Sequence, residues 1–141
     1  GAGVRERVLE AVRIALATAV VCGAAAMAVF VSNPRLLVGL FLDPSTHAAR
    51  IAIAGLPWFA LGFICFIVNL TVIGYYQSLE RIGIASVYAI LRGFVFLLPS
   101  FLWMPRLCGT EGIWLAMPLS EMLTTLVILG VYLWRRRLRV G

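Results

Sequence analysis

Residues 112–134 read GIWLAMPLSEMLTTLVILGVYLW, a run in which Glu121 is the only charged side chain. A helix rises about 1.5 Å per residue, so a helix over this run would measure about 35 Å. The hydrocarbon core of a bilayer is about 30 Å thick. The stretch therefore predicts a transmembrane helix with a carboxyl group near its middle.

Three further apolar runs lie upstream and cover residues 14–31, 51–75 and 82–104. None of them alternates polar and apolar residues with a period of two, as the strands of a membrane barrel do. The sequence therefore predicts an all-α membrane protein with four transmembrane helices that run up and down within a single membrane domain over residues 1–141. Residues 135–141 are expected to form a basic cytoplasmic tail.

The composition agrees with this prediction. Of the 141 residues, 62% are hydrophobic and 13% are charged, whereas soluble domains average about 45–50% and about 25%. A soluble globular protein is excluded. The first run is longer than the apolar region of a signal peptide, which has about 7–15 residues, and Glu6 and Glu10 precede it. We therefore expect a membrane helix there rather than a signal peptide.

The 12 basic residues are all arginines, and their distribution predicts the orientation. With four spans, one side of the membrane carries eight arginines and the other side three, the eight being Arg5, Arg7, Arg13, Arg81, Arg135, Arg136, Arg137 and Arg139. Basic residues gather on the cytoplasmic side of membrane proteins. We therefore expect both termini in the cytoplasm, the protein in a cell membrane in contact with lipid, and no nucleic acid as partner.

The connection between the first two runs contains its own signals. Residues 34–42 are apolar apart from one arginine and are expected to lie along the outer interface of the membrane. Asp43 and Pro44 end that segment, and the hydroxyl of Ser45 or Thr46 can cap the next helix.

Arg92 and Glu121 are the candidate functional residues within the membrane. Arg92 lies about 15 Å into its run and Glu121 about 14 Å into the antiparallel one, so both reach nearly the same depth. A single charge at a helix centre costs about 2.5–3.5 kcal/mol on insertion scales. Two interpretations follow: Glu121 is a proton- or cation-linked carboxylate in a transport path, or the two side chains form a buried ion pair that fixes the register of two helices.

Neighbouring polar and aromatic residues extend this candidate site. Tyr88 and Phe96 lie one helical turn from Arg92, a spacing that allows cation–π contact. Thr125 lies within one turn of Glu121, and Asn69 can form hydrogen bonds between helices.

Small residues at four-residue spacing predict two close helix contacts. The two ridges are Ala11, Ala15, Ala19 and Gly23 in the first run, and Gly112, Ala116, Ser120 and Thr124 in the last. Pro57, Pro99 and Pro118 each remove a backbone donor and are candidate sites of helix bending. Kinked or broken helices are common in transporters, where they line a cavity.

No motif indicates enzymatic chemistry. Cys22, Cys65 and Cys108 lack the spacing of a metal or redox site, and His47 stands alone in a loop. The glycosylation sequon at Asn69 lies inside an expected span. We therefore expect no catalytic residue, no metal site and no cofactor.

Several segments in a fixed order carry a family resemblance. They are Leu40–Asp43, Gly74–Arg81 (GYYQSLER), Leu91–Gly93, Phe96–Pro99 and Gly112–Glu121, together with Gly1–Gly3 followed by the charged segment Arg5–Glu10. This order and spacing resembles the last four helices of the multidrug and toxic compound extrusion (MATE) family of cation-coupled antiporters, over essentially the whole chain.

The resemblance implies a part of a twelve-helix transporter with two lobes. The four runs would be helices nine to twelve, and the partners would be the remaining helices, a small-molecule drug and Na⁺ or H⁺ as coupling ion. The principal coupling carboxylates of the family would lie outside this chain. Some branches carry an acidic residue midway along the tenth helix, and residues 61–70 contain none here.

Two alternatives remain open at the level of sequence. One is an exporter of lipid-linked sugars or polysaccharides from the same superfamily, which shares the two-lobe design. The other is a small four-helix membrane scaffold without transport activity.

Overall fold

The computed structural model describes the backbone of residues 2–140 and the side chains of residues 3–138. Within this part of the chain all regular structure is helical, as the sequence predicted. The elements are α1 (Ala2–Ser32), α2 (Pro34–Gly39), α3 (His47–Ala60), α4 (Phe63–Ser78), α5 (Ile82–Ile90), the π-helical segment η1 (Leu91–Val95), α6 (Leu97–Cys108) and α7 (Glu111–Val140).

Three stretches of helix are long and apolar enough to cross a membrane: Gly3–Ser32, Ile82–Cys108 and Glu111–Leu138. A fourth crossing results if α3 and α4 together form one bent span. Large apolar side chains such as Val21, Phe41 and Leu102 are exposed on the outside of the bundle. In a membrane protein such apolar surfaces face lipid. In water their exposure would be unfavourable.

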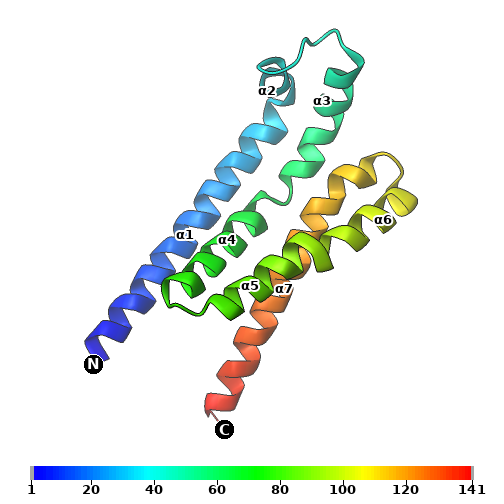
Figure 1. The fold of residues 1–141 in the computed structure, drawn as a ribbon. Coiled ribbons are helices and arrows are strands. Elements are labelled where there is room, and N and C mark those ends of the chain that lie inside the picture. Colours follow the sequence, from blue (N-terminus) through cyan, green and yellow to red (C-terminus); the bar gives the residue numbers. More distant parts are fainter. Residues whose placement is uncertain (1, 141) are drawn as a thin grey trace.

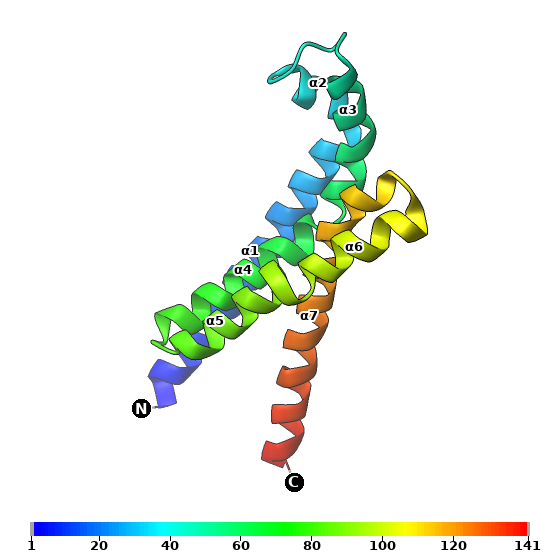
Figure 2. The same cartoon turned by 45° about the vertical axis from the view of Figure 1, so that its right-hand side comes forward.

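The helices are arranged as two pairs that lie against each other. α1 runs beside α4, and α6 lies antiparallel to α7, so that both described ends of the chain reach the same end of the bundle (Figure 1). α3 and α4 both pack on α7 and connect the pairs. Figure 2 shows that the C-terminal part of α7 extends away from α5.

The second predicted span is helical but broken and bent. Residues 51–75 are divided between α3 and α4, whose axes differ by 57°. The break lies at Leu61 and Gly62, whose amides donate to carbonyls three residues earlier at 3.3 Å each. Gly62 lies against Pro118 of α7, where a Cβ on the glycine would come within 2.8 Å of the proline Cα. Pro57, one turn upstream, already lacks a backbone donor.

The third predicted span is helical but not regular. The amide of Phe96 donates to the carbonyl of Leu91 at 2.9 Å, which is a five-residue step typical of a π-helix. Pro99 follows within the first turn of α6, where a missing amide costs no hydrogen bond. The irregular turn therefore lies before the proline and includes Arg92.

The last span is one helix that is longer than predicted. α7 continues through Pro118 without interruption, and its backbone remains helical through Arg135–Arg137. The segment predicted as a basic tail therefore continues α7 as helix over its described residues.

The two ridges of small residues have different outcomes. All four members of the α7 ridge are buried: Gly112, Ala116, Ser120 and Thr124. In α1, Ala19 and Gly23 are buried, and a Cβ on Gly23 would come within 2.8 Å of the Cα of Ile64. Ala11 and Ala15 are exposed, so the α1 ridge is a close contact over only half its length.

The predicted cap at the start of α3 is confirmed. The hydroxyl of Thr46 caps α3 by accepting a hydrogen bond from the amide of Ala49 at 3.2 Å. Asp43 accepts hydrogen bonds from the amide and the hydroxyl of Ser45, at 2.9 and 2.7 Å. Both bonds favour the ionised carboxylate, so the pKa of Asp43 lies below its ordinary value of 3.8.

Candidate functional site

Glu121 is the buried centre of a polar network inside the bundle. Its position on α7 follows Ser120 of the small-residue ridge, so the carboxylate points towards the neighbouring helices. Only 3% of the residue is exposed. The carboxylate forms an ion pair with Arg92, whose Nη2 donates to Oε1 and whose Nε lies 3.0 Å from Oε1 and 3.2 Å from Oε2. The sequence-predicted pairing of these two charges is confirmed.

Asn69 of α4 brings a third helix into the network. Its side chain is fully buried, and its Nδ2 donates to Oε2 of Glu121 at 2.8 Å and to the main-chain carbonyl of Glu121 at 2.9 Å. The hydroxyl of Thr125 lies 2.9 Å from Oδ1 of Asn69 and 3.0 Å from the Glu121 carbonyl. Asn69 and Thr125 thus join Arg92 and Glu121 in one network. The sequence placed Thr125 within one turn of Glu121 and predicted an interhelical hydrogen bond for Asn69, but it did not identify the partner of Asn69.

The irregular turn around Arg92 is held by α7 as well. The main-chain carbonyl of Arg92 accepts a hydrogen bond from the hydroxyl of Ser120 at 2.6 Å. A π-helical turn leaves a carbonyl free of its regular partner, and the serine next to Glu121 supplies the donor. Both the side chain and the backbone of Arg92 are therefore attached to consecutive residues of α7.

The aromatic partner of Arg92 differs from the one expected. The guanidinium carbon lies 4.8 Å from the centre of the Phe66 ring, and neither Tyr88 nor Phe96 makes this contact. Tyr88 instead packs with Ile73 and Ala85 in a separate apolar cluster. Phe66 lies three residues before Asn69 on α4, but spacing within one helix gives no signal that this face of α4 meets Arg92.

The network is saturated with hydrogen bonds. Among the described residues, no buried side-chain nitrogen or oxygen lacks a partner. Each carboxylate oxygen of Glu121 accepts from more than one nitrogen, which offsets the cost of removing the charge from water. The Arg92 side chain is 18% exposed and that of Glu121 is 4% exposed. A proton or cation that reaches Glu121 would therefore have to displace Arg92 or Asn69.

Other polar candidates stay outside this site. The three cysteines are free thiols, and within the described residues no group of histidine, cysteine and acidic side chains has the geometry to hold a metal ion.

Comparison of the chain with protein-family models, with curated proteins and with solved structures finds no match. In the described residues the chain is an all-helical membrane protein. The ion pair between Arg92 and Glu121 joins the irregular turn to α7, and Asn69 joins α4 to the same carboxylate.

Proposed function

We propose that this chain is the C-terminal four-helix part of a MATE-like multidrug transporter, which exchanges organic cations for Na⁺ or H⁺ by alternating access. In this proposal α1, the bent pair α3–α4, the continuous α5–η1–α6 segment and α7 are the four spans. Both termini lie in the cytoplasm, and the protein resides in the inner or plasma membrane.

The observation that carries the proposal is the buried Glu121 carboxylate at the meeting point of interrupted helices. Intramembrane carboxylates are expensive, and in transporters they mark ion and proton pathways. Arg92 lies within the π-helical turn, and the break between α3 and α4 packs on Pro118, one turn before Glu121. Irregular helices that surround a polar site are typical of transporters.

The arrangement suggests how a coupling ion could act. The carboxylate binds Arg92 and Asn69 in the present state. Protonation, or binding of Na⁺, would weaken the attraction between Glu121 and Arg92 and release the turn that Arg92 belongs to. The contact would then have two states, with Arg92 bound to Glu121 or released from it. Ion binding is coupled to movement of the helix if the ion binds these two states with different affinities.

The first prediction tests this role. In the intact transporter we expect Glu121→Gln to abolish efflux driven by an ion gradient, because the glutamine side chain cannot gain or lose a proton. Membrane abundance should stay near normal, because glutamine keeps an acceptor for Arg92. The measurement is drug efflux from proteoliposomes under separate Na⁺ and H⁺ gradients. Glu111→Gln is the matched control, because Glu111 is an exposed acidic residue at the start of the same helix.

A structural role would give a different result. If Glu121→Gln lowers membrane abundance, and the double variant Arg92→Met/Glu121→Leu restores it, the ion pair serves folding rather than coupling. Apolar replacement of both partners of a buried pair is often neutral or stabilising, whereas loss of one partner is costly.

A further inference from the structure

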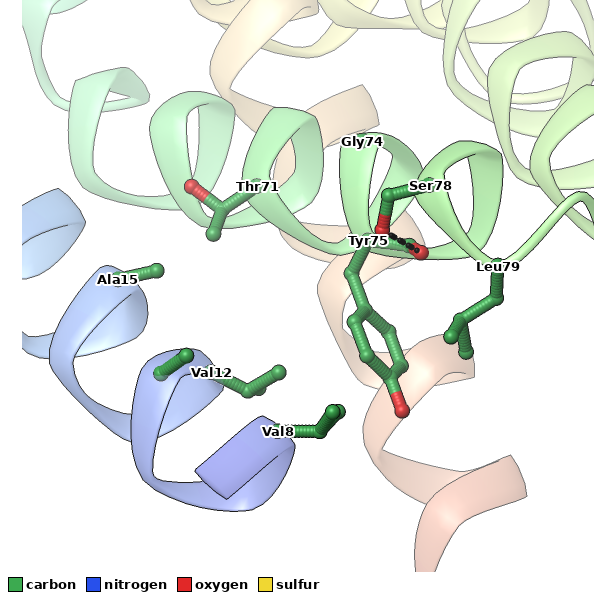
Figure 3. A pocket seen from close by; sticks show the side chains of 9 residues that line it. Val8, Val12, Ala15, Thr71, Gly74, Tyr75, Ser78 and Leu79 are labelled. Carbon is green, nitrogen blue, oxygen red and sulfur yellow. Dashed lines mark hydrogen bonds between the residues drawn. The ribbon is translucent and has the colours of Figure 1, made fainter. Parts of the chain in front are cut away.

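A groove between α1 and α4 lies outside the Glu121 network. Its volume is 480 Å³, within the range of about 300–1,000 Å³ that is usual for ligand pockets. Figure 3 shows side chains of α1 facing side chains of α4 across this space. The lining includes Val8, Val12 and Ala15 from α1, and Gly74, Tyr75 and Leu79 from α4.

The lining is apolar, and it has room because small residues stand on both walls. Ala15 belongs to the exposed half of the α1 ridge, and a Cβ on Gly74 would meet no atom within 4 Å. The Ser78 hydroxyl bonds to the Tyr75 carbonyl at 2.8 Å, and the Thr71 hydroxyl bonds to the Ile67 carbonyl at 2.8 Å. Both hydroxyls are thus occupied within α4, which leaves a surface suited to a hydrocarbon chain.

The charges of α1 are divided between two faces. The groove residues of α1 follow helical spacing, and Arg5 lies three residues before Val8, next to the same face. Arg7 lies on the flank of that face. Glu6, Glu10 and Arg13 are spaced at four and three residues and therefore share the opposite face.

The end of the groove is therefore positively charged. Arg81 and Glu80, in the turn after α4, offset each other. The surplus comes from Arg5 and Arg7, and the exposed arginines 135–137 of α7 extend towards the same end of the bundle (Figure 1). Basic residues beside a membrane attract anionic lipid headgroups, and tyrosines such as Tyr75 are common at that depth.

We propose that the α1–α4 groove binds an anionic phospholipid, with an acyl chain between Val12 and Tyr75 and the headgroup at Arg5 and Arg7. This site is separate from the Arg92–Glu121 pair and does not depend on transport activity. Attraction of about 1 kcal/mol per arginine corresponds to about fivefold in affinity for each.

Native mass spectrometry of the intact protein tests the proposal. The delipidated protein is titrated in detergent with phosphatidylglycerol and with phosphatidylcholine of identical acyl chains. We expect one molecule of phosphatidylglycerol to bind more tightly than phosphatidylcholine. Arg5→Gln/Arg7→Gln should remove that preference, whereas Arg13→Gln on the opposite face should retain it.

A second pair of variants tests the groove itself. Ala15→Phe should fill it and lower the binding of both lipids, whereas Ala17→Phe, which lies on the opposite face of α1 and is also exposed, should not. Gly74→Leu fills the same space from α4 and provides an independent variant if Ala15→Phe does not fold.

Three results would overturn the proposal. Equal affinity of the wild-type protein for the two lipids would show that Arg5 and Arg7 do not select an anionic headgroup. Unchanged binding in both Ala15→Phe and Gly74→Leu removes the groove as the site. A wild-type dimer that becomes a monomer in the filling variants identifies a second copy of the chain as the occupant.

Discussion

At the scale of single residues, Asn69 determines how the buried charges are arranged. Its carboxamide donates to both the side chain and the backbone of Glu121, so it holds α4 to α7 while Arg92 holds η1 to α7. A carboxylate with only one donor in a low-dielectric interior would remain poorly compensated. Asn69 therefore supplements the cationic partner and connects the carboxylate to a third helix.

We expect Asn69→Leu to destabilise the protein by about 2–3 kcal/mol, because leucine has a similar size but leaves two acceptors of Glu121 without this donor. Thermal unfolding in detergent measures the effect. Thr71→Val is the matched control, since the Thr71 hydroxyl donates only to Ile67 of its own helix. Equal losses in the two variants would contradict the assigned role of Asn69.

The sequence was sufficient to pair Arg92 with Glu121, because the depth of a residue in the membrane follows from its distance to the end of an apolar run. It was insufficient to identify Phe66 as the aromatic partner of Arg92. Sequence spacing predicts neighbours within one helix, whereas Phe66 lies on another helix. Its approach depends on the rotation of α4 about its axis.

At the scale of elements, the bend between α3 and α4 depends on a contact with α7. Gly62 has an ordinary helical backbone conformation, with φ −82° and ψ −8°, so its own torsions do not require glycine. The requirement comes from Pro118, which occupies the space where a side chain would stand. The break is therefore fixed by packing between two spans.

Gly62→Ala should accordingly destabilise the protein by about 1–3 kcal/mol through overpacking. Gly74→Ala should have the opposite sign and stabilise α4 by about 0.5–1 kcal/mol, because its site is open and alanine is the better helix former. Both changes are read from unfolding transitions in the same detergent. A neutral Gly62→Ala would show that the α3–α4 bend does not rest on Pro118.

At the scale of the whole molecule, the helix pairs place both described ends of the chain at the same end of the bundle (Figure 1). Most arginines gather there, among them Arg5, Arg7 and the arginines of the last turns of α7. The turn between α6 and α7, next to Cys108, lies at the other end. Because basic residues gather on the cytoplasmic side of membrane proteins, we predict that this end of the bundle faces the cytoplasm.

That orientation is tested by thiol labelling in intact cells. With Cys22 and Cys65 replaced by alanine, the exposed Cys108 should react with a membrane-impermeant maleimide added outside. A Leu138→Cys variant that lacks all three native cysteines should react only after permeabilisation. The reverse pattern would place the termini outside and contradict the arginine argument.

Composition and apolar run length are local properties, and they were enough to predict a membrane protein made of helices and to pair Arg92 with Glu121. The bend at Gly62, the π-helical turn around Arg92 and the choice of Phe66 and Asn69 as its surroundings required the folded bundle. A lipid environment supplies no hydrophobic force between helices, so their axial rotation and close contacts are set by side chains that are distant in sequence. The pattern of one run cannot contain that information, because the partner surface belongs to another run.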